Sequence, residues 1–278
     1  MKIAVIGCGY VGSKIARFWH DRGHTVTVTT TTPDKVNDLS AIADRVVVTQ
    51  GDDLVKLQEI LANQEVILLS VGAKKRDRAT YERAYLETAK NIVSAVKDIP
   101  SIKQIIYTGT HAVLGDRRGE LTDEECAIAP VNEYGEILAQ TEATLLSAQR
   151  VNLKVCIVRL AGIYGKNREL IKIFKTWAGT TRPGKGENYI NWIHIDDIVN
   201  ALEFIRYKEL AGIYHLSSDE TLTRKEFFER LFRTHNLPGI SWDNSTLDRR
   251  SLNVRLDNSK IKAEGFELTH PQIIFSNK

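Results

Sequence analysis

A glycine-rich stretch, Gly7-Cys8-Gly9-Tyr10-Val11-Gly12, lies near the start of the chain. It follows an apolar run of strand length, Lys2–Ile6, and precedes a stretch of helical periodicity, Ser13–Arg22, and a second strand-length run, Thr25–Thr29. A strand, a turn with three glycines, a helix and a second strand within about thirty residues form the arrangement that binds a dinucleotide. A strand–helix turn that merely needs glycines is the alternative, and the surrounding pattern favours the dinucleotide.

Each glycine in this turn has its own expected role. Gly7 permits the tight turn, Gly9 lets the backbone approach a pyrophosphate, and Gly12 lets the helix pack closely on the strand. The pyrophosphate would accept hydrogen bonds from the first amide groups of the helix, at the positive end of its dipole. We therefore expect Gly7, Gly9, Tyr10, Val11 and Gly12 to bind a cofactor.

Strand-length apolar runs alternate with helical patterns along most of the chain. The runs are rich in Val and Ile without clean alternation, as expected of parallel strands covered on both faces. The pattern predicts an α/β fold with a doubly wound parallel sheet, of the Rossmann type. The expected strands are Lys2–Ile6, Thr25–Thr29, Arg45–Thr49, Val66–Ser70, Gln104–Thr108, Val155–Arg159 and Ile213–Leu216, and the later helices are Leu54–Asn63, Thr80–Lys97, Glu133–Arg150 and Asp196–Tyr207.

The regular alternation of strand-length runs and helical patterns ends after Gly165. Lys166–Thr176 has a helical pattern, Thr180–Asn191 has the composition of a loop, and Thr223–His235 has the pattern of an amphipathic helix. We expect residues 1–165 to form the dinucleotide-binding domain, with residues 193–218 returning to it. Residues 166–192 and 219–278 would build a smaller, interleaved C-terminal lobe that binds substrate.

The end of the second strand distinguishes NAD from NADP. An Asp or Glu there would bond the ribose 2′-hydroxyl of NAD and repel the 2′-phosphate of NADP. This chain has Thr29-Thr30-Thr31-Thr32 instead, and Lys35 follows closely. Because hydroxyl and ammonium groups bind phosphate, we expect NADP, with NAD as the less favoured cofactor, and Thr30, Thr31 and Lys35 among its ligands. High β propensity would explain the threonines but not the missing acid.

Motifs at the ends of later strands resemble those of a known family. They are Ser70-Val71-Gly72-Ala73, Tyr107–Asp116, Pro130–Gly135, Arg159–Gly165 and Asn191–Asp197. Together with the glycine turn, they resemble the extended or atypical branch of the short-chain dehydrogenase/reductase superfamily, in the NAD(P)-dependent epimerase/dehydratase family. The resemblance implies that Ser70, Val71 and Gly72 contact the cofactor and that Asp52 touches its adenine. The neighbouring Asp53 is a candidate N-cap of the next helix.

The same resemblance implies catalytic residues. Thr110 matches the hydroxyl that polarises a substrate carbonyl, and Tyr134 matches the acid and base of the hydride transfer. Family members place a Lys four residues after the Tyr, where its charge favours phenolate, but Leu138 stands there in this chain. A cation from Lys74, Lys75, Arg76 or Arg78, or the positive ring of an oxidised cofactor, could take its place. A buried aromatic at a helix start and a loop-capping hydroxyl are the structural alternatives for Tyr134 and Thr110.

Composition excludes several function classes. The 278 residues carry a formal net charge of only +3 and no long basic run, so nucleic acid is not an expected partner. Three cysteines without paired or metal-ligand spacing suit a reducing compartment, and no apolar run reaches the roughly 18 residues of a membrane span. We expect a cytoplasmic protein that works in water.

The small net charge hides an asymmetry. Residues 151–278 carry 20 Lys and Arg residues and 15 Asp and Glu residues. Within 154–186 there are eight basic residues, and Glu169 is the only acidic residue in that stretch of sequence. This favours an anionic small-molecule substrate. No metal is expected, because His194 with Asp196 and Asp197 makes a poor ligand set. The family resemblance implies instead that Asp196 or Asp197 caps a helix.

These observations predict a NADP-dependent oxidoreductase or epimerase. It would act on a hydroxyl or carbonyl of a polar, anionic substrate such as a nucleotide sugar, with Tyr134 as the acid and base. The alternative is a cofactor-binding sensor or regulatory protein that has lost turnover, which Leu138 motivates. The resemblance also implies a homodimer formed by the helices Thr80–Lys97 and Glu133–Arg150.

Overall fold

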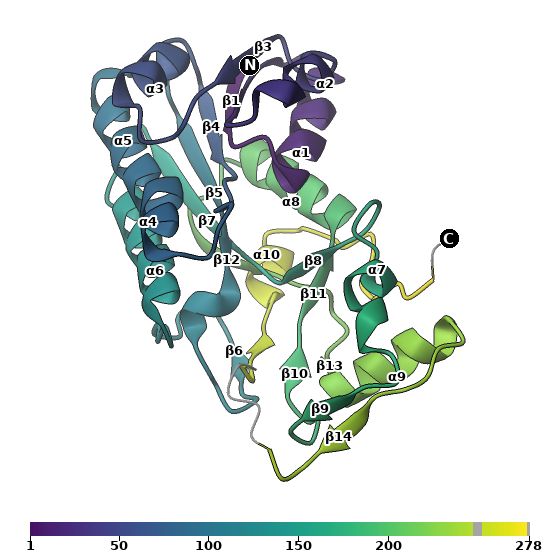
Figure 1. Ribbon diagram of the computed structural model, residues 1–278. Coiled ribbons are helices and arrows are strands. Elements are labelled where there is room, and N and C mark those ends of the chain that lie inside the picture. Colours follow the sequence, from purple (N-terminus) through teal and green to yellow (C-terminus); the bar gives the residue numbers. More distant parts are fainter. Residues whose placement is uncertain (247–251, 277–278) are drawn as a thin grey trace. The chain divides into compact units, whose positions relative to one another are not determined.

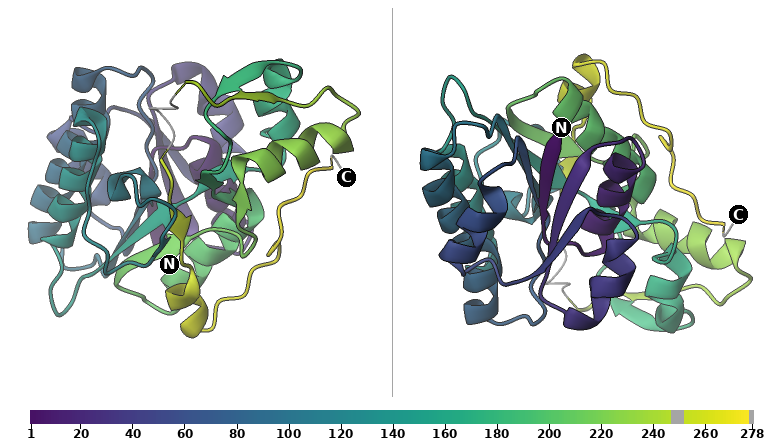
Figure 2. Two further views of the ribbon diagram at one scale, coloured as in Figure 1. Left: turned by 90° about the horizontal axis from the view of Figure 1, so that it is seen from below. Right: turned by 90° about the horizontal axis from the view of Figure 1, so that it is seen from above.

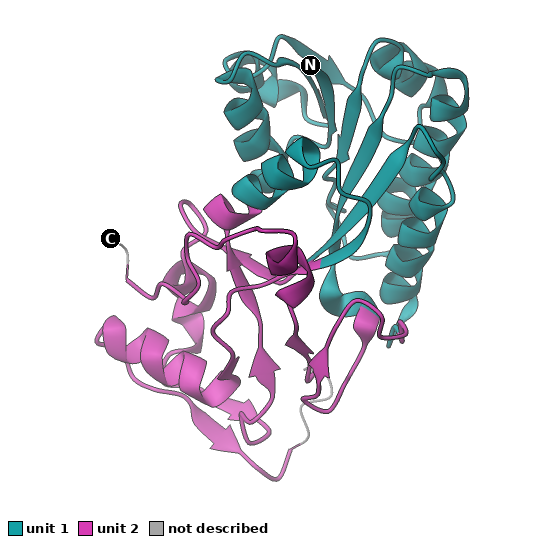
Figure 3. Cartoon of the chain, turned by 180° about the vertical axis from the view of Figure 1, so that it is seen from behind, with its two compact units in different colours: residues 1–113, 130–159, 199–214 teal, residues 114–129, 160–198, 215–278 magenta. Residues whose placement is uncertain are grey.

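A computed structural model describes residues 1–246 and 252–276 (Figure 1). The chain divides into two compact units, which are distinguished by colour in Figure 3. Unit 1 comprises Met1–Val113, Pro130–Arg159 and Val199–Tyr214, and unit 2 comprises Leu114–Ala129, Leu160–Ile198 and His215–Lys278. Residues 247–251 and 277–278, which belong to the lobe expected over 219–278, lie outside the described residues. The finer domain boundaries stay a prediction.

The main sheet confirms the doubly wound α/β fold. Its strands run in the order β12–β7–β5–β4–β1–β2–β3, and β1 pairs in parallel with both β2 and β4. The seven strands expected from the sequence are the seven strands of this sheet, which lies in unit 1 apart from the last residues of β7 and β12. They are β1 (Lys2–Ile6), β2 (Thr25–Thr30), β3 (Arg45–Val48), β4 (Val66–Leu69), β5 (Gln104–Thr110), β7 (Lys154–Leu160) and β12 (Gly212–Leu216).

Helices cover both faces of this sheet (Figure 2). Leu57, Ile60, Ile92 and Leu145 pack into one apolar core with the strands, so α3, α5 and α6 lie on the same face. On the other face, Trp19 of α1 donates a hydrogen bond to Glu203 of α8 at 2.8 Å. The helices concerned are α1 (Tyr10–His20), α2 (Val36–Ser40), α3 (Leu54–Leu61), α4 (Arg78–Tyr81), α5 (Thr88–Ala95), α6 (Glu133–Leu146) and α8 (Ile195–Tyr207).

Several helix boundaries in unit 1 differ from the expected ones; α3 ends at Leu61 rather than Asn63, and α6 ends at Leu146 rather than Arg150. Helix α1 begins at Tyr10 rather than near Ser13, so Tyr10, Val11 and Gly12 form its first turn. The helix expected over Thr80–Lys97 begins at Arg78 as α4, continues through a π-helical turn at Glu82–Glu87, and becomes α5. The glycine turn therefore leads directly into helical amide groups.

Unit 2 is built from short strand pairs and helices around an aromatic core. Phe227, Phe228 and Phe232 of α9 pack with Trp192 and Tyr164. A capping box of Thr223 and Glu226 starts α9, which confirms the amphipathic helix. The elements are β6 (Leu121–Thr122), β8 (Gly162–Tyr164), α7 (Leu170–Phe174), β9 (Thr181–Pro183), β10 (Tyr189–Ile190), β11 (Trp192–His194), β13 (Leu222–Thr223), α9 (Arg224–Thr234), β14 (Ser241–Asp243), β15 (Arg255–Leu256) and α10 (Ser259–Ala263).

Two expectations for this unit were wrong in part. The helix expected over Lys166–Thr176 is shortened to α7, and the loop expected over Thr180–Asn191 contains the short strands β9 and β10. Each of these strands is fixed by a partner distant in sequence, β14 and β13 respectively. Among the helices of the described residues, none is long and apolar enough to cross a membrane.

Candidate functional site

A pocket of about 540 Å³ opens in unit 1 at the carboxyl edge of the sheet. Parallel strands end at the same edge, so the loops after β1, β2, β3 and β4 meet there, as in ligand-binding α/β sheets. The helical stretch from α4 to α5 closes the remaining side. The lining residues are Ile6, Gly7, Cys8, Gly9, Thr29–Thr32, Lys35, Thr49, Gln50, Gly51, Ser70–Gly72, Lys74, Lys75, Thr80, Arg83, Ala84 and Thr88.

The glycine turn has the geometry that its expected roles require. Gly7 has a positive φ of 94°, and a Cβ there would stand 2.6 Å from the Ser70 carbonyl oxygen. A Cβ on Gly12 would stand 2.3 Å from the Gly7 carbonyl oxygen, so only glycine lets α1 start this close to β1. A Cβ on Gly9 would meet nothing within 4 Å. The open side of Gly9 thus allows a ligand to approach the backbone.

The threonine run at the end of β2 has two structural roles. The Thr29 hydroxyl accepts a hydrogen bond from the Gly7 amide at 2.9 Å and so holds the glycine turn. Thr30 is buried, and its hydroxyl accepts from the Thr32 amide at 3.2 Å. Beyond it, the Lys74 ammonium donates to the Thr31 carbonyl at 3.5 Å and the Thr32 hydroxyl at 3.3 Å. The edge therefore carries a positive charge where NAD-binding proteins of this fold place an acid.

The two aspartates after β3 separate as expected. Asp53 is the N-cap of α3 and accepts from the Lys56 amide at 3.0 Å. Asp52 instead forms an ion pair with Arg83 at 3.4 Å and lines an adjoining hollow, which shares Thr31 and Gln50 with the main pocket. Both aspartates line this hollow; Asp52 pairs with Arg83, and Asp53 also caps α3.

Tyr134 stands in the first turn of α6, after the N-cap Asn132. Its hydroxyl donates to the Arg76 carbonyl oxygen at 3.1 Å, and the Arg76 guanidinium carbon lies 5.2 Å from the centre of its ring. Its ring also contacts Tyr81, with centroids 4.8 Å apart. Of the cations considered from the sequence, Arg76 is the one that the structure places against this ring.

The surroundings of Leu138 and Thr110 indicate structural roles for both side chains. Leu138 is buried, with 9% of its surface exposed, so it packs where family members carry a lysine. The Thr110 hydroxyl accepts from the Ala112 amide at 3.2 Å and caps a turn after β5. Neither Tyr134 nor Thr110 occurs among the described residues that line the pocket. Eight of the expected cofactor residues line this pocket, whereas Tyr10, Val11, Gly12 and Asp52 and the expected catalytic pair are not among its described lining.

The described pocket walls contain one thiol, that of Cys8. Burial raises the pKa of Cys8 to about 12, against the smaller opposing effect of Lys35. Its backbone amide donates to the Thr29 carbonyl at 2.9 Å. The thiol therefore stays protonated near neutral pH and is unsuited to be a nucleophile.

Three of the eight basic residues within 154–186 form ion pairs with acidic side chains. Arg159 is buried in unit 1, where its guanidinium donates to the Glu142 carboxylate at 2.9 Å. Lys154 pairs with Glu209 at 3.3 Å, and Lys172 of unit 2 pairs with Glu169 at 2.9 Å. Their charges are largely compensated, which weakens the sequence-based argument for an anionic substrate.

Several residues that line the pocket were not predicted from the sequence. Thr49, Gln50 and Gly51 directly follow β3, so the carboxyl-edge rule could have selected them. Thr80, Arg83, Ala84 and Thr88 repeat at helical spacing within a helix that the sequence predicted, but no signal distinguished this face from the others.

In unit 2, Asp197 does not cap α8 with its side chain, because its carboxylate accepts hydrogen bonds from the Thr269 and His270 amides.

A family model described as the NAD dependent epimerase/dehydratase family matches residues 3–215. The chain belongs to this family. This confirms the resemblance in the sequence motifs. Protein YeeZ of Escherichia coli (strain K12) is 28% identical over 280 residues, which cover 97% of this chain and 96% of that protein.

Solved structures show the same fold. DesIV, a dTDP-glucose 4,6-dehydratase from Streptomyces venezuelae with NAD and TYD bound, has a TM-score of 0.82 at 20% identity, covering 99% of this chain and 93% of its own. UDP-glucose 4-epimerase from Thermotoga maritima with UDP-glucose has a TM-score of 0.79 at 20% identity, covering 97% and 94%. At this level of identity the comparison supports the fold alone.

Proposed function

We propose that this protein is a NADP-dependent oxidoreductase or epimerase. It acts on a hydroxyl or carbonyl group of a polar, anionic small molecule such as a nucleotide sugar. Membership of the NAD dependent epimerase/dehydratase family supports the reaction class. The substrate class is proposed by analogy with the Thermotoga maritima epimerase, which shares the fold and was solved with UDP-glucose.

The observation that carries this proposal is the fit of the unit 1 pocket to a dinucleotide. Gly9 leaves open space on its Cα, and helix α1 begins at the turn with no acidic residue in its first turn. A pyrophosphate there would meet the first amide groups of α1 and the positive end of the helix dipole. Gly7, Gly9, Tyr10, Val11 and Gly12 would hold it, while Ser70, Val71, Gly72 and Asp52 would contact the nicotinamide and adenine portions.

The preference for NADP rests on the charge at the end of β2. Lys35, Lys74 and Lys75 line the pocket together with Thr30 and Thr31. Ammonium and hydroxyl groups stabilise a 2′-phosphate, which a carboxylate at this place would repel. We therefore assign the 2′-phosphate to Thr30, Thr31 and Lys35, with Lys74 as an additional cation.

The nicotinamide would supply hydride acceptance and donation. In our proposal Tyr134 removes or returns the hydroxyl proton, and Thr110 donates a hydrogen bond to the reacting oxygen. The Arg76 guanidinium, 5.2 Å from the Tyr134 ring centre, supplies the positive charge that the family lysine supplies elsewhere. Tyr134 must exchange its hydrogen bond to the Arg76 carbonyl for one to the substrate.

The second candidate is a cofactor-binding sensor without turnover. Two observations favour it: Leu138 is buried at the family lysine position, and the Tyr134 hydroxyl is engaged by a backbone carbonyl. A sensor would keep the pocket of unit 1 and bind the dinucleotide without transferring hydride. The two candidates share the cofactor and differ in catalysis.

Titration of the protein with NADPH and with NADH tests the cofactor assignment. We expect NADPH to bind at least tenfold more tightly, and Lys74→Gln to weaken NADPH more than NADH. Lys90→Gln, which removes an exposed lysine charge outside the pocket lining, is the matched control. Tighter binding of NADH by the unaltered protein would overturn the proposed preference.

Hydride transfer to candidate nucleotide sugars distinguishes the enzyme from the sensor. If turnover is found, Tyr134→Phe should lower kcat by roughly a hundredfold or more, because it removes the proton donor. Arg76→Ala should lower kcat, and Arg76→Lys should restore part of it, since the charge returns. An unchanged kcat in Tyr134→Phe would exclude Tyr134 from the mechanism.

A further inference from the structure

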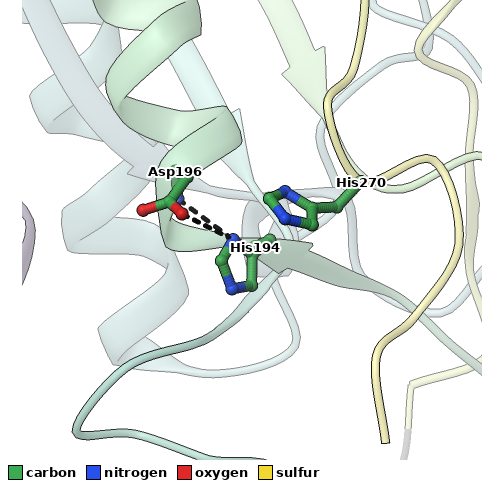
Figure 4. A group of neighbouring side chains, drawn as sticks. All are labelled: His194, Asp196 and His270. Carbon is green, nitrogen blue, oxygen red and sulfur yellow. Dashed lines mark hydrogen bonds and ion pairs between the residues drawn. The ribbon is translucent and has the colours of Figure 1, made fainter. Parts of the chain in front are cut away.

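Two imidazoles and a carboxylate meet in unit 2 where β11 leads into α8 (Figure 4). His194 ends β11, Asp196 lies in the first turn of α8, and His270 belongs to the C-terminal segment after α10. One ligand-capable atom of each residue lies within 4.8 Å of those of the others. The His194 Nδ1 and the Asp196 Oδ2 are 3.6 Å apart, and the two ring centroids are 4.0 Å apart.

His270 is held in one orientation by a buried carboxylate. Asp197 is fully buried and accepts from the Thr269 amide at 2.6 Å, from the His270 amide at 3.1 Å, and from the His270 Nδ1 at 3.2 Å. An ionised carboxylate can only accept hydrogen bonds, so the Nδ1 of His270 carries the hydrogen. In the neutral ring, the lone pair is then on Nε2. A carboxylate behind a histidine in this way is the arrangement that orients metal-binding histidines.

His194 is suited to be the second nitrogen ligand. Its side chain is 13% exposed and packs edge-on against the Tyr164 ring at a centroid distance of 5.1 Å. Its Nδ1 accepts a hydrogen bond from the Asp196 amide, so this nitrogen carries the lone pair that a metal ion would bind.

The carboxylate of Asp196 completes the set from the solvent side. Its side chain is 64% exposed, so an ion can reach it without opening the unit. The Asp196 amide donates to the His194 Nδ1 at 3.3 Å, a long hydrogen bond that a metal bond would replace. Ligands of a tetrahedral Zn²⁺ with bonds of about 2.0–2.1 Å lie roughly 3.3–3.5 Å apart, close to the His194–Asp196 spacing.

We propose that His194, Asp196 and His270 bind one divalent transition-metal ion, with Zn²⁺ as the best fit. Two nitrogen ligands and one oxygen ligand suit Zn²⁺ and leave a fourth position for water, whereas Mg²⁺ and Ca²⁺ prefer sites made of oxygen. The ion would join the start of α8 to the C-terminal segment that follows α10. Asp197 acts as a positioning residue through His270.

Titration calorimetry of the full chain with Zn²⁺, after treatment with a chelator, tests this site. We expect one equivalent to bind with a Kd in the micromolar range or below and to raise Tm, because the ion binds the folded state. Asp196→Asn and His270→Gln should each weaken binding at least tenfold. His20→Gln is the matched control, since His20 and Asp21 form an exposed His–Asp pair, 3.9 Å apart, outside the cluster.

The folding of each variant is checked by its metal-free Tm. If His270→Gln fails to fold, Asp196→Asn decides, because this exposed side chain can change without opening the unit. Absence of saturable Zn²⁺ binding by the unaltered chain would overturn the proposal. Undiminished binding by Asp196→Asn, equal binding of Mg²⁺, or loss of binding in His20→Gln would overturn it as well.

Discussion

Gly9 and Gly12 belong to one turn, but a methyl group would meet different surroundings at the two positions. At Gly12 it would collide with the Gly7 carbonyl oxygen at 2.3 Å, whereas at Gly9 it would meet no atom within 4 Å. The backbone φ of Gly9 is −88°, outside the left-handed region that favours glycine. One glycine is therefore required by the fold, and the other is free to serve a ligand.

This difference predicts opposite phenotypes for two alanine variants. Gly12→Ala should lower the free energy of unfolding by about 3 kcal/mol, because backbone atoms must move to admit the methyl group. Gly9→Ala should keep its Tm and lose at least tenfold in NADPH affinity, because the methyl group occupies the approach of the pyrophosphate. Thermal unfolding and cofactor titration of both variants measure this. Equal loss of stability in the two variants would contradict the assigned roles.

The cysteines should differ sharply in reactivity. Burial raises the pKa of Cys8 to about 12, Cys156 is fully buried, and Cys126 is partly exposed. Because the thiolate is the nucleophile, iodoacetamide at pH 8 should modify Cys126 first and leave Cys8 unmodified until the chain is denatured. Peptide mass spectrometry identifies the modified positions. Rapid modification of Cys8 in the folded protein would show that the glycine turn opens readily.

At the scale of the element, α6 carries both Tyr134 and the buried Leu138. Leu138→Lys would restore the family pattern, but it would bury an ammonium group without a partner. We expect a loss of about 3 kcal/mol in the free energy of unfolding and no gain in kcat, since Arg76 already lies at the ring. Leu138→Met keeps the volume and should cost less than about 1.5 kcal/mol. A more active, equally stable Leu138→Lys would argue against the role of Arg76.

The Glu142–Arg159 ion pair joins α6 to β7. The Arg159 Nε and Nη2 both donate to the Glu142 carboxylate, and both side chains are almost fully buried. Burial raises the pKa of Glu142, while Arg159 lowers it. Glu142→Gln leaves a buried guanidinium uncompensated and should cost about 3 kcal/mol. Denaturant unfolding should show that Glu142→Leu combined with Arg159→Met recovers most of this loss, and additive losses would contradict the coupling.

The elements of the main sheet could be predicted because burial on both faces leaves continuous apolar runs in the sequence. The short strands of unit 2 could not. Strand β15 has two residues and pairs with β6, so its existence depends on a partner that no local pattern reveals. The candidate sites show the same difference between features set by local sequence and features set by contacts between distant segments. Pocket residues after β1, β2 and β4 were predicted from the sequence, although those after β3 were missed. The meeting of His194 with His270 depends on the buried Asp197, which holds the C-terminal segment.

At the scale of the whole molecule, the two units carry different proposed ligands. The dinucleotide pocket is lined by residues of unit 1, and the proposed metal ligands lie in unit 2. NADPH should therefore slow amide hydrogen exchange in residues 7–12, 30–35 and 70–75, because bound ligand suppresses local opening. Zn²⁺ should slow exchange near residues 194–197 and 267–272. Mass spectrometry resolves these segments.

The control for this hydrogen-exchange experiment is Gly9→Ala at the same NADPH concentration. This variant should lose the NADPH-dependent protection of amides in unit 1 and keep the Zn²⁺-dependent protection in unit 2. Tm alone cannot separate the two ligands, because each binds the folded state and stabilises it by mass action, by about 2.7 kcal/mol at a hundredfold excess over Kd. Protection by NADPH confined to unit 2 would contradict the placement of the cofactor in the glycine-turn pocket. It would also remove the structural basis for assigning the 2′-phosphate to Thr30, Thr31 and Lys35.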